Sequence, residues 1–491
     1  MIELGLVVTI LLPILAGLMV FAYKPMKRDK VRNWFVISTV VINALITLYL
    51  VVSDTVSVEW FQLTKEIPVV FTNDAVAKIY SSIIAVIWIA CGLYAFEYMK
   101  HENAPHRYFC YFLITLGMLN GVSYSGNLLT LYMSFEFMSF ASMPLVLHSL
   151  KKEAVSAGLK YIFYSVGGVS LALLAIGYFS QYTQADVFVA GGSLDLVKVA
   201  GHESMILWMT FLSIVGFGVK AGMFPLHGWL PTAHPVAPAP ASALLSGVIV
   251  KAGIVAIVRV IFYVVGADTI RGTWVQTTWM ILALVTVFMG SMLAYKEKIL
   301  KKRLAYSTVS QVSYILVGLA TLDTSGILGA FIHLISHALV KDIVFLCAGA
   351  IIYKTGKIYV RELRGVGKEM PITLWCFTFA AISLIGIPPT GGFLSKWLIA
   401  AGSLSTGMRV LSWLAPVILI ISALLTAGYL LSIAINAFFP GDEFNYKQLK
   451  KKEPNYYMTV PLVSLTVLVY CIAMFPMPIL NFVRTMVEQI L

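Results

Sequence analysis

Charged residues are scarce in this chain of 491 residues, and their scarcity is the first constraint on its class. Only 12% of the residues are Asp, Glu, Lys or Arg, whereas 59% are hydrophobic, and the mean hydropathy is +0.87. Soluble domains carry about 25% charged residues. The composition therefore excludes a set of soluble domains, a disordered chain and a nucleic-acid binder, despite the formal net charge of +12. It indicates a membrane protein with many spans.

Cysteines are few and cofactor motifs are missing. Cys91, Cys110, Cys347, Cys376 and Cys471 lie in separate hydrophobic segments without a C-x-x-C pair. This spacing excludes the usual iron–sulfur and zinc motifs and predicts buried structural thiols. The sequence has neither a phosphate-binding loop nor a dinucleotide fingerprint. We therefore expect no cofactor and no metal in this chain, so that any redox chemistry belongs to partner subunits.

Long hydrophobic segments dominate what is present. A helix needs about 20 residues to cross the bilayer core. Fourteen segments satisfy this requirement to within a few residues, at 2–23, 31–52, 74–99, 107–122, 126–149, 154–180, 204–232, 239–266, 273–294, 302–321, 325–353, 370–402, 410–438 and 457–484. The first is expected to be a span and not a cleavable signal, because the basic cluster 24–32 follows it. Alternation in 55–71 predicts a hairpin outside the membrane.

The basic residues fall mainly on one side of these spans. Alternate connections carry 24 of the 35 Lys and Arg residues, and the opposite connections carry only 5. Basic residues favour the cytoplasmic side of a membrane. We name the side with 24 the basic side and expect it to face the cytoplasm, with both termini on the outer side of the cell membrane. Lys78 and Arg259 lie near span ends and are expected to snorkel to the interface.

A further set of ionisable residues lies deep within the spans. The set comprises Glu136, Lys220, Lys251, His333, His337, Lys341, Asp342 and Lys396. A charge at mid-bilayer costs roughly 2.5–3.5 kcal/mol on insertion scales, so such residues usually face a bundle interior or a hydrated path. One buried pair could simply hold two helices together. A set of ionisable residues spread over five helices indicates a path for ions instead.

Spacing suggests how some of these groups work. Glu136 has apolar neighbours and needs a cation from another helix, for which Lys220 is the best candidate. His333, His337 and Lys341 recur every four residues and so share one helical face. Imidazole has an unperturbed pKa near neutrality, which suits a proton wire. Helix–helix hydrogen bonding and a two-histidine metal site are the alternatives for the histidine pair.

Two spans contain helix-breaking residues next to a lysine. The seventh span holds Gly218–Pro225 around Lys220, and the twelfth holds Gly386–Gly392 before Lys396. Broken spans in corresponding positions of two halves are typical of inverted-repeat transporters. Spans 4–8 and 9–13 would then form two inverted five-helix repeats. The expected division is 1–106, three N-terminal helices; 107–266 and 267–438, the two repeats; and 439–491, a cytoplasmic loop with the last helix.

At these motifs the sequence resembles a known family. The stretch 219–234, VKAGMFPLHGWLPTAH, followed by Ser246-Gly-Val-Ile-Val-Lys251, is similar to the signature of antiporter-like subunits. These occur in respiratory complex I, in Mrp-type cation/proton antiporters and in the membrane arms of energy-converting hydrogenases. Glu136, the run 305–311, the His333/His337 helix and the 386–396 region extend the resemblance over nearly the whole chain.

The resemblance implies an all-α, fourteen-helix fold and a lateral proton path. Glu136 and Lys220 would form the ion pair of a first half-channel, and Lys251 with the His333, His337 and Lys341 group would link it to Lys396, the terminal exchange group. Lys396 stands where one complex I branch has glutamate, and the chain ends soon after its last span. Both features resemble the smaller Mrp subunit and the hydrogenase arms.

The implied partners are other membrane subunits, including further antiporter-like ones, together with protons, the lipid bilayer and, as a second candidate cargo, sodium; no nucleic acid is expected. The alternatives are a stand-alone sodium/proton or small-solute transporter, a non-conducting scaffold subunit and a direct role in quinone reduction.

Overall fold

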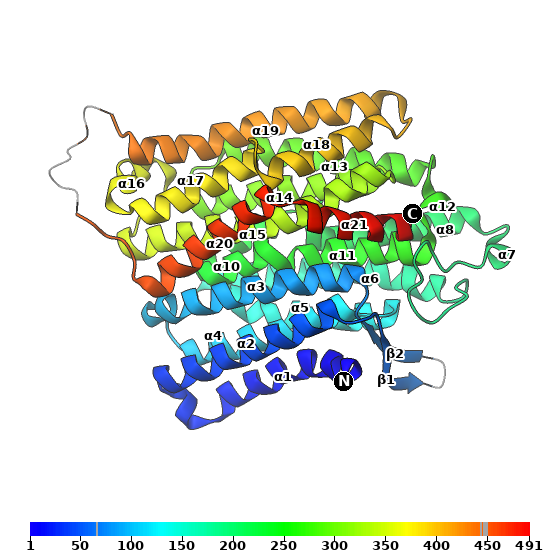
Figure 1. Cartoon of the computed structure of the whole chain (residues 1–491), viewed down its shortest axis with the longest axis horizontal. Coiled ribbons are helices and arrows are strands. Elements are labelled where there is room, and N and C mark those ends of the chain that lie inside the picture. Colours follow the sequence, from blue (N-terminus) through cyan, green and yellow to red (C-terminus); the bar gives the residue numbers. More distant parts are fainter. Residues whose placement is uncertain (65–66, 442–443, 445–449) are drawn as a thin grey trace.

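The computed structural model describes residues 1–64, 67–441, 444 and 450–491. Almost all of the described elements are helices, and the long ones lie side by side along one direction (Figure 1). In order along the chain, the first half contains α1 (Ile2–Ala22), η1 (Lys24–Lys27), α2 (Asp29–Val52), β1 (Ser57–Thr64), β2 (Ile67–Thr72), α3 (Ala75–Tyr98), η2 (Met99–His101), α4 (Pro105–Tyr124), α5 (Leu128–Val146), α6 (Lys152–Phe179), α7 (Leu196–Val199), α8 (Glu203–Ala221) and α9 (Leu230–Val236).

The remaining elements are α10 (Ala239–Leu244), η3 (Leu245–Ile249), α11 (Lys251–Val258), η4 (Arg259–Val265), α12 (Ala267–Ile270), α13 (Trp274–Lys296), α14 (Leu300–Ala320), α15 (Thr324–Thr355), η5 (Val360–Leu363), α16 (Val366–Glu369), α17 (Pro371–Ile385), α18 (Gly391–Leu404), α19 (Arg409–Phe438), α20 (Tyr456–Met474) and α21 (Met477–Ile490). The segments η3 and η4 are π-helical, so α10 to η4 form one continuous but irregular helix.

Helices occupy all fourteen predicted segments. Within the described residues, eleven helices are both long and apolar enough to cross a membrane. Helices α4 and α14 are long but less apolar, because they carry buried polar side chains such as Asn120 and Gln311. The last predicted segment is divided into α20 and α21, which are separated at Phe475 and Pro476. The chain is a polytopic helical membrane protein.

The predicted hairpin is confirmed by β1 and β2, which pair antiparallel. It lies at the same end of the helix bundle as both termini, whereas α16 lies at the opposite end (Figure 1). The basic connections, including η1 and α16, belong to the opposite end. This arrangement separates the basic side from the termini, as the charge pattern predicts.

The two most buried long helices lie at the centre of the bundle. The most apolar windows of Ala239–Val265 and Thr324–Thr355 are 100% and 89% buried. Helix α15 begins where the Asp323 carboxylate accepts hydrogen bonds from the Ser325 and Gly326 backbone N–H groups, and it ends at Gly356 in the left-handed conformation. Four of the predicted deep ionisable residues are on α15 and one is on α11. The fold therefore places most of this set away from lipid.

Both predicted interruptions are present. Helix α8 ends one residue after Lys220, where Gly222 takes a left-handed conformation with φ of 75°. Helix α17 ends at Ile385, where the next residue, Gly386, has φ of 89°, and α18 begins at Gly391. Glycine adopts positive φ without the steric cost that a Cβ brings. The glycines therefore end each helix close to a lysine of the deep set, Lys220 or Lys396.

Two expectations for individual residues are wrong. Arg259 does not snorkel: its guanidinium is 1% exposed and makes a two-point ion pair with Asp74, with Nη2 2.8 Å from Oδ1. Arg259 does lie near the end of a span, but Asp74, at the start of α3, supplies a counter-charge there. Cys471 is exposed and not buried, because it lies on the outward surface of α20, whereas the other four thiols are buried as predicted.

Candidate functional site

Lys220 is held by hydroxyl groups from two neighbouring helices. Its side chain is buried near the end of α8, and Nζ donates to the hydroxyl oxygens of Tyr161 at 2.6 Å, Ser139 at 2.9 Å and Ser165 at 3.2 Å. Nζ also lies 4.3 Å from the centre of the Tyr161 ring. A buried ammonium needs such partners because leaving water is costly. The three hydroxyl groups satisfy all three ammonium donors.

Glu136 lies near Lys220 but does not contact it directly. It is half-buried on α5, three residues before Ser139, so both side chains are on one side of that helix. In the described part of the chain its Oε2 atom has no hydrogen-bond partner, and no Glu136–Lys220 ion pair is formed. The direct pair implied by the resemblance is therefore open, because hydroxyl groups already occupy the Lys220 donors. Ser139, one helical turn after Glu136, accepts one of these hydrogen bonds.

Lys251 begins α11, directly after the π-helical turn η3. It is fully buried, and its Nζ donates to the backbone oxygen of Ser246, which the widened turn leaves available. The Ser246 hydroxyl is 2.6 Å from that of Thr308 on α14. The irregular turn thus gives the lysine an internal acceptor and connects it to α14.

Asp342 lies in the same central region. The sequence places it among the deep ionisable residues but indicates no role for it. It is fully buried, and its Oδ2 accepts a hydrogen bond from the Cys91 thiol at 3.3 Å. Oδ1 has no hydrogen-bond partner among the described residues. A Cβ at Gly247 would lie 2.4 Å from this oxygen, so only glycine leaves room for the carboxylate against η3. Its position next to Lys341 was the only signal in the sequence.

The histidine helix has the geometry that its spacing predicts. The rings of His333 and His337 stack with centroids 5.6 Å apart at 14°. Both nitrogens of His337 lack a hydrogen-bond partner in the described chain, and the ring is 1% exposed. One turn further, Lys341 Nζ donates to the Ser307 hydroxyl at 2.8 Å and to the Leu304 backbone oxygen at 3.3 Å. These three residues form a continuous face of α15.

Lys396 closes the row at the break between α17 and α18. Its Nζ donates to the backbone oxygens of Leu384 at 2.6 Å and Ile385 at 3.0 Å, which are left free where α17 ends. The same atom lies 4.8 Å from the centre of the Tyr314 ring, which in turn stacks on His333 at 5.5 Å. His333 Nδ1 is also 2.9 Å from the Ser395 hydroxyl. Lys396 and the histidine pair are therefore neighbours.

The structure thus groups the predicted residues into a first cluster, Lys220 with nearby Glu136; a central cluster, Lys251, Lys341 and Asp342; and a last cluster, His333, His337 and Lys396. Hydroxyl and phenol groups fill the spaces around them, and sequence reasoning missed these partners, namely Ser139, Tyr161, Ser165, Ser246, Ser307, Thr308, Tyr314 and Ser395. Serine and tyrosine are common in membrane helices, so their types alone carry no signal. Amines, imidazoles and hydroxyls in such a series can hold and exchange protons.

The fold and this buried row define a class: a polytopic helical membrane protein with ionisable residues in its interior. A family model described as "NADH:quinone oxidoreductase/Mrp antiporter, TM" matches residues 125–426. The chain belongs to this family of antiporter-like membrane subunits.

Similar proteins come from several kinds of complex. The chain is 33% identical to NADH-quinone oxidoreductase subunit N of Desulforudis audaxviator over 73% of this chain and 70% of that protein. It is 28% identical to a Na(+)/H(+) antiporter subunit of Alkalihalophilus pseudofirmus over 99% and 97%. Among solved structures, an archaeal membrane-bound sulfane sulfur reductase has a chain with a TM-score of 0.85 and 22% identity, over 99% of both chains. The Mrp complex from Dietzia sp. has one with a TM-score of 0.85 and 20% identity, over 99% and 97%.

Proposed function

We propose that this chain is a proton-conducting, antiporter-like subunit of a multi-subunit membrane complex. The observation that carries the proposal is the row of buried ionisable residues from Lys220 to Lys396. A buried amine or imidazole without a fixed counter-ion changes its protonation state readily when a neighbouring charge changes. The relatives named above, from NADH-quinone oxidoreductase and Na(+)/H(+) antiporter complexes, support this reading.

The proposed path has three stages. A proton enters at Glu136 and Lys220, with Ser139 and Tyr161 as bridging hydroxyls. It then passes through Lys251, Lys341 and the stacked pair His333 and His337. Lys396 is the exchange group, because it lies at a helix break and is only partly covered. Each transfer moves one proton between neighbours, and the driving reaction or counter-ion exchange belongs to partner subunits, which include further antiporter-like chains.

The membrane topology belongs to the same proposal. We infer fourteen crossings with two inverted repeats, spans 4–8 and 9–13, which relate the break after Lys220 to the break before Lys396. Helices in all fourteen segments and termini at one end of the bundle support an even number of crossings (Figure 1). The basic side would face the cytoplasm of a cell whose plasma membrane holds the complex.

Substitution of the first cluster tests the proposal. Glu136→Ala and Lys220→Ala in the complete complex should abolish proton translocation, measured by a pH-sensitive dye in membrane vesicles, while assembly on native gels is retained. Lys198→Ala, which removes an exposed lysine far from the row, is the matched control. Normal translocation in both first-cluster variants would refute the proposal.

A further inference from the structure

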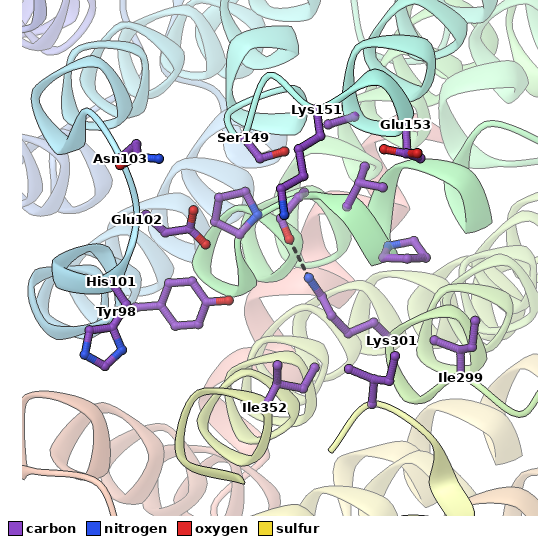
Figure 2. Close-up of a pocket in the computed structure, with 16 residues that line it drawn as sticks. Tyr98, His101, Glu102, Asn103, Ser149, Lys151, Glu153, Ile299, Lys301 and Ile352 are labelled. Carbon is purple, nitrogen blue, oxygen red and sulfur yellow. Dashed lines mark hydrogen bonds between the residues drawn. The ribbon is translucent and has the colours of Figure 1, made fainter. Parts of the chain in front are cut away.

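A cavity of about 570 Å³ opens on the basic side of the bundle. Its wall is built from five connections: the end of α3 with η2 and the following loop, the start of α6, the turn between α9 and α10, the start of α14 and the region after α15. Figure 2 shows Glu102, Lys151 and Lys301 among the side chains that face it. The relay described above does not use these residues.

Glu102 is the carboxylate that points into this cavity (Figure 2). It lies in the loop between η2 and α4 and is half-buried. Burial raises its pKa, and the opposing positive charges of Lys301, Lys151 and His101 offset only part of that increase. Glu153, on α6, is the other acidic group in the wall, and it is exposed. Glu102 is therefore accessible to water, and it retains a proton more readily than an exposed carboxylate does.

Lys301 forms the inner wall of the cavity. It lies in one of the connections on the basic side, yet it is only 5% exposed. Its Nζ donates to the backbone oxygen of Ala237, in the turn between α9 and α10, across the dashed contact in Figure 2. A lysine that served only to mark the cytoplasmic side would extend into water. Here the amine is instead folded inward.

Beyond Lys301 the central cluster is only one helical turn away. Lys301 precedes Leu304 by three residues on α14, a rise of about 4.5 Å, and the Leu304 backbone oxygen accepts the hydrogen bond from Lys341 Nζ at 3.3 Å. His234 occupies the adjoining space: its ring is fully buried, stacks on Phe345 at 4.6 Å and lies within electrostatic reach of Lys301, Lys341 and Lys251. Neither His234 nitrogen has a hydrogen-bond partner among the described residues.

We propose that this cavity is a proton entry site on the basic side, in which Glu102 collects protons and Lys301 passes them through His234 to Lys341. The inference rests on the proposed function. Protonated Glu102 gives its proton to neutral Lys301, which leaves a carboxylate and an ammonium facing each other. The ammonium then donates to an imidazole nitrogen of His234, which becomes cationic, and the second nitrogen releases a proton to neutral Lys341. Each step moves one proton. Glu102 then takes up the next proton from water in the cavity, and His234, left in its other neutral tautomer, returns to the first by rotation of its ring.

Conservative substitutions distinguish proton transfer by Lys301 from a purely structural role of its hydrogen bond to Ala237. Lys301→Arg keeps the positive charge and the hydrogen bond to Ala237, but a guanidinium does not release its proton. We expect Lys301→Arg and Glu102→Gln to slow proton translocation by the intact complex in vesicles at least about tenfold, since a positioned proton donor contributes roughly 10²–10⁴-fold. For Glu102→Gln the loss of translocation rate should grow as the pH on the basic side rises, because proton uptake depends more on the carboxylate when free protons are scarce. Glu102→Asp should retain part of the rate.

Matched controls use neighbours outside the cavity wall. Lys302→Arg changes the next residue, which is partly exposed and pairs with Glu297. Glu362→Gln removes an exposed carboxylate charge on the same side while keeping the acceptor oxygen for the Ile358 and Tyr359 backbone N–H groups. Both should leave the rate unchanged. Full activity of Lys301→Arg would show that Lys301 only tethers two elements and would overturn the proposal.

Blocking the cavity gives a second measurement. In a Cys471→Ser background, which removes the exposed thiol, Ser149→Cys places a thiol in the cavity wall. A charged thiosulfonate reagent added from the basic side should then inhibit translocation, and a reducing agent should restore it. Undiminished translocation after complete labelling would contradict the entry site. If Lys220→Ala abolishes translocation while these variants do not, the entry site is wrong and the proposed function stands; if none has an effect, both are wrong.

Discussion

At the scale of single residues, hydroxyl groups determine how the buried amines are held. Lys220 bonds to three of them, and Tyr161 is the shortest contact at 2.6 Å. The Tyr161 hydroxyl is also 2.5 Å from that of Ser142, so it belongs to a small network. A hydrogen bond to a charged group contributes about 1.5–3 kcal/mol. Removing this phenol oxygen should therefore affect Lys220 without unfolding the protein.

We predict that Tyr161→Phe slows proton translocation while the complex still assembles. The ring still packs against Trp229, but Lys220 loses one of its two hydroxyl acceptors on α6. Initial rates in vesicles and thermal stability in detergent would measure the two effects. Tyr164→Phe, on the same helix and only partly buried, should change neither. Equal rates in both variants and in the unmodified protein would show that the phenol plays no part.

His148 lies in the turn after α5, beyond the end of that helix at Val146, and should make stability depend on pH. Burial, followed by the positive charge of Arg107, lowers the pKa of His148 to about 4. Its Nε2–H donates to the Asn103 backbone oxygen at 2.8 Å. An unfolded histidine has a pKa of about 6.5, so the unfolded chain binds a proton that the folded chain excludes as the pH falls from about 6.5 to 4. This contribution to stability is present above the window and is lost through it.

The size follows from the shift: at 1.36 kcal/mol for each pH unit, the loss across the window is of the order of 3 kcal/mol. His148→Gln keeps a donor for Asn103 and should flatten this part of the pH dependence of thermal unfolding in detergent. The exposed His202, replaced by Gln, should leave the curve as it is. An unchanged slope in His148→Gln would contradict the assignment.

At the scale of elements, the sequence predicted the helix breaks because their causes are local. Glycine and proline act on their own backbone, so the ends of α8 and α17 could be placed from 218–225 and 386–392. The stacking of His333 on His337 follows equally from a four-residue spacing. The hydroxyl partners of Lys220 come from α5 and α6, and the Arg259 partner comes from the start of α3. Such contacts depend on packing between distant segments, which no local pattern encodes.

The first turn of α18 should tolerate no side chain at Gly392. A Cβ there would lie 1.9 Å from the Ser383 backbone oxygen, so α18 would have to move away from α17. That movement would take Lys396 from its two carbonyl acceptors. We expect Gly392→Ala to destabilise the protein by about 1–3 kcal/mol, as overpacking does, and to reduce proton translocation.

Gly167 provides the control for this substitution. It lies within α6, and a Cβ there meets no other atom within 4 Å. Gly167→Ala should be neutral or stabilising by up to about 1 kcal/mol, since alanine favours helix. Thermal unfolding midpoints of the two variants in detergent would be compared. Similar midpoints would show that α18 can shift without cost.

At the scale of the whole molecule, α3 links the three N-terminal helices to the centre of the bundle, where buried polar contacts add to its apolar packing. These three helices lie outside residues 125–426, which the family model matches. The Tyr80 and Tyr94 hydroxyls donate to the backbone oxygens of Val248 and Leu346, at 2.9 and 2.8 Å. The Asp74–Arg259 pair adds a charged link from the start of α3 to η4. These contacts hold α3 against the two most buried helices of the bundle.

The ion pair should show strong coupling between its two members. Asp74→Asn preserves the cap on α3, where the Asp74 side chain accepts from the Ala77 N–H, but leaves the Arg259 charge buried and unpaired. Breaking a buried pair in this way costs about 3–5 kcal/mol, whereas replacing both members is often far less harmful. We therefore expect the double variant Asp74→Asn/Arg259→Met to be more stable than Asp74→Asn alone. Denaturation of all four proteins in mixed micelles would measure the coupling, and simple additivity of the single effects would show that the pair contributes nothing to the attachment of α3.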